Sequence, residues 1–300
     1  MYVITGATGH TGSVATKTLL ARGHKVRAIG RNADHLKLLA EVGAEPFVAD
    51  ITDAKRLAEA FRGAEAVYAM IPPNPSSNDF RAFQQQITEA LAAAISNTKV
   101  KFVVSLSSIG ADKSSGTGPV IGLYNLKQKL NRIPDLNALH LRAGYFMENT
   151  LAQAGAIKAM GKAAGPLRPE LKLPMIATRD IGAAAAQELI QLSFQGKQTR
   201  ELLGQRDLTM SEVAAIIGNA IGKPGLACVQ LPDDQMRAAL VQFGMSSNFA
   251  GLILEMASAL NSGRMRALET RSAKNTTPTS YEQFVAENFV PLFQKQTTAA

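Results

Sequence analysis

The fold is decided by the stretch Tyr2-Val3-Ile4-Thr5-Gly6-Ala7-Thr8-Gly9-His10-Thr11-Gly12-Ser13, close to the start of the chain. A short β-branched run leads into three glycines spaced Gly-x-x-Gly-x-x-Gly, and a helical pattern follows at once, which predicts a strand, a tight turn and a helix. The unpaired N–H groups and the dipole at the start of a helix favour a pyrophosphate there. Gly6 permits the turn, Gly9 lets the backbone approach the phosphates, and Gly12 lets the helix pack closely on the strand. Because a second strand pattern follows, the stretch predicts a dinucleotide site.

The composition sets the outer limits of the molecule. With 300 residues, 46% of them apolar, the chain can bury a large core, as one extended domain or as a large domain with a smaller one. No apolar run approaches the roughly 18 residues of a membrane helix, and the first strand leaves no room for a signal peptide, so we expect neither. The single cysteine, Cys228, excludes an internal disulfide and suits a reducing compartment. A cytoplasmic location is therefore expected.

The net charge of +8 raises the question of nucleic acid binding. The 32 lysines and arginines are spread along the whole chain, and the densest group lies in a Ser/Thr-rich stretch, at Arg264, Arg266, Arg271 and Lys274. That group fits a solvated arm, and a diffuse positive charge also attracts phosphorylated cofactors. We therefore expect no nucleic acid partner.

The residue after the second predicted strand, over residues 25–30, bears on the choice of cofactor. A site that prefers NAD usually has Asp or Glu there, about 20 residues beyond the glycines, to hold the ribose 2′-hydroxyl. This chain has Arg31, whose guanidinium can form two charge-assisted hydrogen bonds with a 2′-phosphate. NADP(H) is therefore favoured over NAD(H). The alternative is that Arg31 is only a solvated residue after a strand.

Strand and helix patterns alternate through the first half of the chain. Helices are expected at 34–42, 54–61 (capped by Asp53) and 78–96, and strands at 45–49, 66–71 and 102–106. This alternation implies an α/β fold with a doubly wound parallel sheet, in which ligands bind beyond the carboxyl ends of the strands. That rule selects one continuous rim, made of 6–12, Arg31, 50–51, 70–72 and 105–108.

The patterns become weaker beyond residue 150. We expect residues 1–150 to form the dinucleotide-binding domain and residues 151–300 a smaller α+β substrate lobe, with a segment at about 176–195 returning to the first domain. Asp180 is expected to cap an Ala-rich helix over 181–193, and Thr209 with Glu212 has the pattern of a capping box. Met and Phe recur at helical spacing further on. They fit a core, and also an adaptable wall for a flat hydrophobic substrate, at Met236, Phe243, Met245, Phe249 and Met256.

Four segments are informative in combination. They are the glycine loop, Asp50-Ile51-Thr52-Asp53, Ser105-Leu106-Ser107-Ser108-Ile109-Gly110, and Leu141-Arg142-Ala143-Gly144-Tyr145-Phe146-Met147-Glu148-Asn149, which is the most specific. Together they resemble the NmrA-like branch of atypical short-chain dehydrogenases/reductases, over roughly the first 220 residues. The resemblance implies an NADP(H)-binding Rossmann domain and a smaller C-terminal substrate lobe. The family includes quinone reductases, plant reductases, and NADP-sensing regulators with little or no catalysis.

The resemblance also implies a set of cofactor contacts. The glycine loop and Arg31 would contact the phosphates, 50–51 the adenine, 70–72 the ribose, and 105–107 with 143–146 the nicotinamide. The expected cofactor-binding residues are Gly6, Thr8, Gly9, His10, Thr11, Gly12, Arg31, Asp50, Ile51, Met70, Ile71, Pro72, Ser105, Leu106, Ser107, Gly144, Tyr145 and Phe146.

The chain lacks the Tyr-x-x-x-Lys pair of typical short-chain dehydrogenases, in which the lysine lowers the pKa of the tyrosine for proton transfer. None of the five tyrosines has a lysine four positions later. Tyr124 and Lys127 share one face of a predicted helix at i and i+3, and are the candidate catalytic residues. The alternative is a surface lysine beside a half-buried tyrosine.

Two functional classes fit these observations. The favoured one is an NADPH-dependent oxidoreductase acting on small quinone-like or conjugated carbonyl compounds, because hydride transfer to an extended acceptor depends chiefly on cofactor positioning. The other is a sensor in which cofactor binding changes the affinity for a protein partner. Sugar-nucleotide epimerisation would need the missing Tyr-x-x-x-Lys pair. We expect a monomer or homodimer with no metal, since the four histidines and one cysteine offer no ligand spacing.

Overall fold

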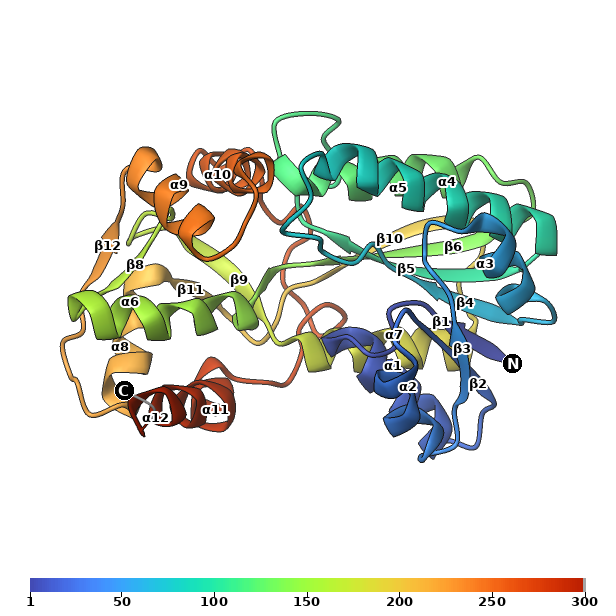
Figure 1. Cartoon of the computed structure of the whole chain (residues 1–300), viewed down its shortest axis with the longest axis horizontal. Coiled ribbons are helices and arrows are strands. Elements are labelled where there is room, and N and C mark those ends of the chain that lie inside the picture. The colour runs from blue at the N-terminus through green and yellow to red at the C-terminus, as the bar shows by residue number, and fades with distance from the viewer. Residues whose placement is uncertain (299–300) are drawn as a thin grey trace.

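The large sheet is the centre of the fold. The computed structural model describes residues 1–298 (Figure 1). Within them, seven parallel strands lie in the order β10-β6-β5-β4-β1-β2-β3. The bounds are β1 Tyr2–Ile4, β2 Val26–Gly30, β3 Glu45–Val48, β4 Ala66–Ala69, β5 Phe102–Ser108, β6 Asn137–Ala143 and β10 Lys197–Leu202. The expected doubly wound α/β sheet is confirmed.

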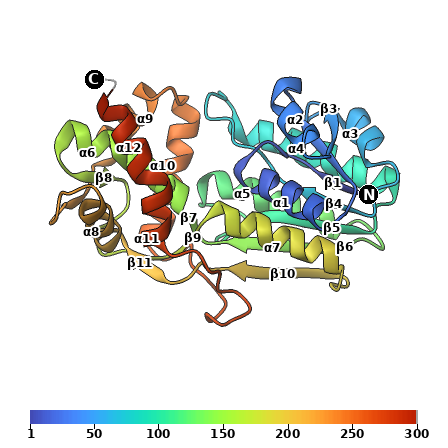
Figure 2. The same ribbon diagram turned by 90° about the horizontal axis from the view of Figure 1, so that it is seen from below.

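Helices cover both faces of this sheet, as Figures 1 and 2 show. One face packs against α1 (His10–Ala21), α2 (Ala33–Ala40) and α7 (Thr178–Gln191), and the other against α3 (Ala54–Phe61), α4 (Phe80–Thr98) and α5 (Ile121–Asn131). Because β4 is covered on both faces, all four of its residues are buried, as its apolar sequence predicts. Among residues 1–298 no helix has the length and apolar character needed to cross a membrane.

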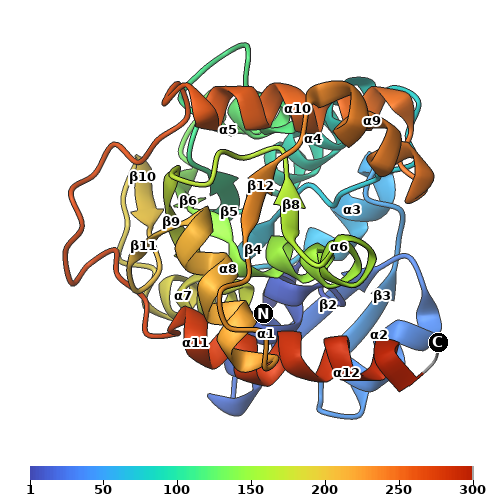
Figure 3. The same ribbon diagram turned by 90° about the vertical axis from the view of Figure 1, so that its left-hand side faces the viewer.

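Most of the second half of the chain, apart from α7 and β10, lies beyond the carboxyl ends of the sheet strands (Figures 1 and 3). It contains a sheet of β11 (Asp207–Thr209), β9 (Lys172–Ile176) and β7 (Tyr145–Phe146), and a pair of β12 (Cys228–Gln230) and β8 (Ala163–Gly165). Its helices are α6 Gln153–Met160, α8 Met210–Ala220, α9 Asp233–Gln242, α10 Ser247–Asn261, α11 Tyr281–Phe284 and α12 Val290–Thr298, with a π-helical segment at Val285–Phe289. The division at residue 150 stays a prediction, while α7 and β10 pack with the large sheet.

Two expectations about the second half are wrong. Asp180 does not cap α7, which begins at Thr178, because the carboxylate of Glu148 accepts hydrogen bonds from the backbone N and the Oγ1 of Thr178 at 3.0 and 2.6 Å. Asp180 is buried instead. The assignment of Phe243 to the core is also wrong, since this residue is 77% exposed at the end of α9, while its alternative role in a substrate wall stays a prediction. The expected capping box of Thr209 and Glu212 is confirmed at the start of α8.

The arginine-rich segment at 264–280 is exposed at Arg264, Arg266 and Lys274, as expected, but it is not a free arm. Glu201 in β10 is fully buried, and its carboxylate accepts hydrogen bonds from the backbone N–H groups of Leu268 and Glu269 at 2.9 and 2.8 Å. Arg271 donates to the carbonyl oxygens of the residues that follow β10. The segment is therefore fastened along the edge strand of the sheet by buried charge.

We expect a Glu201→Ala variant to lose roughly 3 kcal/mol or more of unfolding free energy, because it leaves two part-buried N–H groups without an acceptor and removes one of the two carboxylates beside the buried guanidinium of Arg142, 3.3 Å away. Urea unfolding measures the change. Glu255→Ala is the control: it removes a carboxylate that pairs with Arg81 at the surface, and should cost less than about 1 kcal/mol. Equal losses in the two variants would contradict the assignment.

Candidate dinucleotide site

The glycine loop after β1 requires glycine at positions 6 and 12. Gly6 has a φ of +60°, and a Cβ added to it would lie 2.6 Å from Sδ of Met70. A Cβ on Gly12 would overlap the carbonyl oxygen of Gly6, and one on Gly9 would lie 3.3 Å from the same oxygen. The loop is closed by a hydrogen bond from Gly9 N to Gly6 O at 2.9 Å. The loop backbone is thus tightly folded, and it is exposed to solvent at residues 8–10.

Helix α1 begins on this loop without a side-chain cap. The helices α2, α3 and α4 are capped by the side chains of Asn32, Asp53 and Asp79, respectively. The N-cap of α1 is Gly9, which has no side chain, so the first-turn N–H groups of α1 receive no cap. These groups and the helix dipole form a site for an anion. The residues present therefore fit a cofactor diphosphate.

Thr11 and Tyr68 fix the start of α1 on the sheet. The hydroxyl of buried Tyr68 in β4 donates to Oγ1 of Thr11 at 3.0 Å. On the other side, a Cβ on Gly182 of α7 would lie 2.5 Å from the carbonyl oxygen of Thr11, so the two helices meet at a glycine. The Thr11 side chain therefore holds the loop in place, while Thr8, Gly9 and His10 are exposed above it.

Arg31 and Asp50 follow the neighbouring strands β2 and β3. Arg31 is exposed, and its side chain has no hydrogen bond or ion pair to any residue of 1–298. Asp50 accepts hydrogen bonds from Thr52 N and Oγ1 at 2.8 and 2.7 Å, which lower the pKa of its carboxyl, and the nearby charge of Arg31 adds to that effect. The guanidinium is therefore free to pair with a phosphate.

The expected contact residues lie in spatial order along one edge of the sheet. The strand order puts Asp50 and Ile51 after β3, Arg31 after β2, the glycine loop after β1 and Met70 to Pro72 after β4 (Figure 1). Next come β5, which contains Ser105 to Ser107, and β6, which ends just before Gly144. The sheet thus brings together a rim that the sequence divides among six segments.

Ser105 is engaged inside the protein. It lies opposite His140 in the β5–β6 ladder, with its Oγ 2.7 Å from Nδ1 of that ring, while Nε2 lies 2.9 Å from Oδ1 of Asn131. Because Asn131 Oδ1 accepts from the Nε2–H group, Nδ1 accepts from the Ser105 hydroxyl. Burial lowers the pKa of His140 to about 3, so the ring is neutral. Ser107 is buried beside this group, and its hydroxyl has no hydrogen-bond partner in residues 1–298.

Tyr124 and Lys127 both lie half-buried on α5, which packs on β5 and β6. Burial and the neighbouring charge of Arg142 lower the pKa of the Lys127 ammonium, and Asp112 opposes them. Asp112, which follows β5, forms an ion pair with Arg142, near the end of β6, with an N–O distance of 3.0 Å. The lysine therefore lies near the carboxyl ends of these two strands.

Gly144, Tyr145 and Phe146 carry the chain out of the large sheet. Gly144 N donates to Leu202 O at 2.8 Å, and a Cβ on Gly144 would lie 2.5 Å from the carbonyl oxygen of Pro174. Tyr145 and Phe146 follow in β7 and are half-buried. Burial raises the pKa of Tyr145 to about 12. Both aromatic side chains therefore lie where the sheet meets the second half of the chain.

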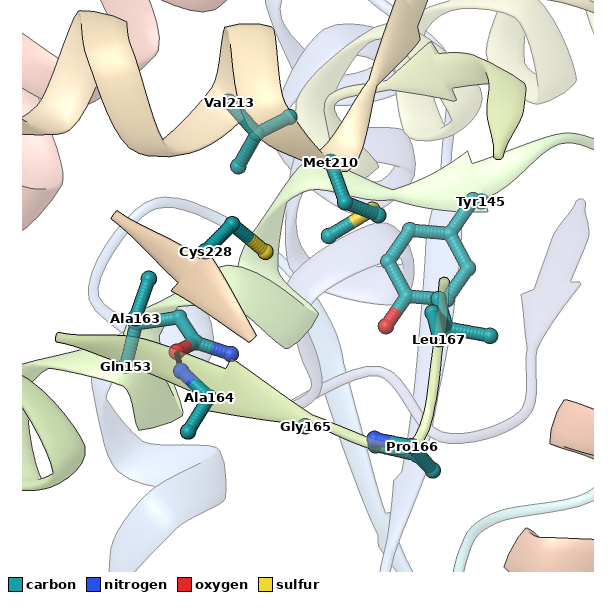
Figure 4. Close-up of a pocket in the computed structure, with 10 residues that line it drawn as sticks. All are labelled: Tyr145, Gln153, Ala163, Ala164, Gly165, Pro166, Leu167, Met210, Val213 and Cys228. Carbon is teal, nitrogen blue, oxygen red and sulfur yellow. Dashed lines mark hydrogen bonds between the residues drawn. The ribbon is translucent and has the colours of Figure 1, made fainter. Parts of the chain in front are cut away.

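The sequence did not reveal a small cavity beside Tyr145, which Figure 4 shows. Its wall combines β7, α6, β8 and α8 with β12, which supplies Cys228. Cys228 is half-buried, and burial raises the pKa of its thiol, so the thiol is mostly protonated at neutral pH. Because these elements are far apart in the sequence, no local pattern marks the cavity. Within residues 1–298, no group of three His, Cys, Asp or Glu side chains could hold a metal ion.

Comparison with known proteins gives relatives over the whole length. The chain is 29% identical over 259 residues to the NAD(P)H azoreductase of Xenophilus azovorans, covering 85% of this chain and 86% of that protein. The NADPH complex of the Escherichia coli quinone oxidoreductase QOR2 superposes with a TM-score of 0.78 and 25% identity, over 98% of this chain and 100% of the other. The negative transcriptional regulator NmrA shares the fold, with a TM-score of 0.68 and 17% identity over 99% and 98% of the two chains.

A family model gives the same relationship over nearly the full chain. The model of the NmrA-like family matches residues 2–285, which include the glycine loop, the sheet edge and the 141–149 segment. The chain therefore belongs to the NmrA-like family.

Proposed function

We propose that this protein is an NADPH-dependent oxidoreductase that reduces small quinone-like or conjugated carbonyl compounds. The observation that carries the proposal is the uncapped start of α1 on a loop that requires glycine at positions 6 and 12, within a continuous rim. The names of the azoreductase and quinone oxidoreductase relatives support the same class. When bound, the cofactor would supply a hydride to the substrate.

The chain's own residues would bind and orient the cofactor. The glycine loop would hold the diphosphate with backbone N–H groups, and Asp50 and Ile51 would lie beside the adenine. Arg31 would pair with the 2′-phosphate, so NADPH would be preferred over NADH. The stretch 143–146 and β5 would line the nicotinamide. We expect a cytoplasmic monomer or homodimer whose second half, from residue 151, contacts a small aromatic or hydrophobic substrate.

A turnover assay tests this proposal. We expect NADPH absorbance to fall when the purified protein is mixed with members of a quinone panel, and to stay constant without a quinone. The competing function is a sensor of the nicotinamide cofactor, favoured by the missing Tyr-x-x-x-Lys pair. A sensor would bind NADPH in a titration and leave the absorbance unchanged with every quinone, and that outcome would refute the enzyme.

Lys127 is expected to deliver the proton that the reduced substrate takes up. Only the protonated ammonium of Lys127 can donate this proton, so the rate should fall as the pH rises through the pKa of Lys127. That pKa lies below the roughly 10.4 of an ordinary lysine. Lys127→Ala should lower the rate roughly 100-fold, which is within the usual range for a general acid. The variant should also lose the fall in rate at alkaline pH. Steady-state rates from pH 6 to 10 measure both.

Tyr124→Phe is the partner experiment on the same helix face. If Tyr124 helps in proton transfer, loss of its hydroxyl should lower the rate roughly tenfold without changing NADPH affinity. Rates and pH profiles that match the parent protein in both variants would remove Tyr124 and Lys127 from the mechanism and leave them as surface residues of α5.

A further inference from the structure

The cavity beside Tyr145 is small. Its volume is about 30 Å³, two to three times the roughly 10–15 Å³ that a cavity needs to hold one water molecule. Apolar groups form most of its wall, among them Leu167, Met210 and Val213. A polar atom is stable in such a space only if the wall supplies hydrogen-bond partners.

Polar side chains face the cavity from opposite sides. Figure 4 shows the Tyr145 hydroxyl and the Gln153 amide pointing toward it, with Cys228 Sγ between them. Oε1 of Gln153 accepts a hydrogen bond from Ala164 N at 2.8 Å, so this bond fixes the amide and leaves Nε2 as a donor. A Cβ on Gly165 would lie 3.6 Å from Nε2, so the glycine keeps the approach to this donor open.

The hydroxyl of Tyr145 is a hydrogen-bond donor at neutral pH. Burial raises the pKa of the phenol to about 12, and the side chain of Asn149 lowers it in part. The phenol is therefore protonated, and Figure 4 shows its hydroxyl on the side of the cavity.

We propose that this cavity binds a carbonyl oxygen of the substrate, with the Tyr145 hydroxyl and the Gln153 Nε2–H group as its two donors. The proposal rests on the proposed function, which puts the 143–146 stretch along the nicotinamide. A carbonyl oxygen fits in this volume and accepts two hydrogen bonds, and the apolar groups of the wall would lie beside the carbon that bears it. Both donors would also stabilise the negative charge that grows on this oxygen during reduction. A substrate without such an oxygen would leave both donors without this acceptor and be disfavoured.

Two variants test the donors without removing the wall. Tyr145→Phe deletes one hydroxyl, and Gln153→Glu keeps an oxygen for Ala164 N but replaces the second donor by an anion that repels a carbonyl. With anthraquinone-2-sulfonate as substrate, kcat/KM should fall roughly tenfold or more in each variant, the value of one hydrogen bond. Tyr281→Phe is the matched control, since its buried hydroxyl donates to Thr150 Oγ1 at 2.8 Å and does not line the cavity.

Cys228 supplies a second readout that needs no turnover. It is the only cysteine in the sequence, and its sulfur lies at the cavity. With NADP⁺ present, so that no reduction occurs, anthraquinone-2-sulfonate should slow the alkylation of Cys228 by iodoacetamide in the parent protein and in Tyr281→Phe. The protection should be lost in Gln153→Glu.

The outcomes separate this inference from the proposed function. Unchanged kcat/KM and unchanged protection in Tyr145→Phe and Gln153→Glu, with an active parent, would overturn the carbonyl subsite alone. Protection of Cys228 without any reduction would support the subsite and refute the reductase. A parent that binds NADPH, yet neither reduces the quinone nor protects Cys228, would overturn both.

Discussion

Gly12→Ala is expected to raise the dissociation constant for NADPH roughly 100-fold or more, equivalent to about 2.7 kcal/mol. The added methyl would overlap the carbonyl oxygen of Gly6, which is backbone and cannot turn aside. The loop must then open, and the N–H groups at the start of α1 lose the arrangement that fits a diphosphate. Isothermal titration with NADPH measures the effect.

Two further variants separate this effect from general unfolding. Gly9→Ala brings its methyl to 3.3 Å from the same oxygen, a tight contact that the loop can tolerate, while covering the face open to phosphates. It should fold and still bind NADPH weakly. Gly155→Ala adds a methyl on α6 with no atom nearer than 3.9 Å, and should bind like the parent. Parent-like affinity in both Gly9→Ala and Gly12→Ala would contradict the role of the loop.

Arg31→Ala is expected to weaken NADPH binding roughly 30-fold, about 2 kcal/mol, as for the loss of hydrogen bonds to a charged group. NADH lacks the 2′-phosphate, so its affinity should change little, and most of the preference for NADPH should disappear. Fluorescence titration of the parent and the variant with both cofactors measures the two affinities.

Arg22→Ala is the control for net charge. Arg22 is exposed after α1, before β2 begins, so it lies at the opposite edge of the sheet from Arg31. Its loss removes the same charge and should leave the preference for NADPH intact. Equal affinities of the parent for NADPH and NADH would show that Arg31 is only a solvated residue.

The dinucleotide side of the fold could be predicted because its determinants are local. The glycine loop, the residue after β2 and the apolar runs of β4 and β5 each lie within a few consecutive residues, and the rule for parallel sheets assembles them into one rim. No contact between distant segments had to be known in advance. The predicted role of each residue in holding the cofactor stays a prediction.

Other features depend on contacts between distant segments and were missed. Strand β6 lacks the apolar run of a central strand because it contains His140 and Arg142. Both side chains are buried, since His140 hydrogen-bonds Ser105 and Arg142 forms an ion pair with Glu201. Strand β10, Lys197–Leu202, is a charged edge strand with only its last two residues buried. Asp180 resembles a helix cap by position, but the start of α7 is satisfied by Glu148, thirty residues away. The cavity beside Tyr145 has a wall made of five elements.

A crystal structure with NADP⁺ bound tests the central claim most directly. The account predicts the diphosphate within hydrogen-bonding distance of the N–H groups at the start of α1, above Gly9, with the 2′-phosphate against Arg31. A diphosphate bound elsewhere, or a loop whose amides point away from the cofactor, would contradict it.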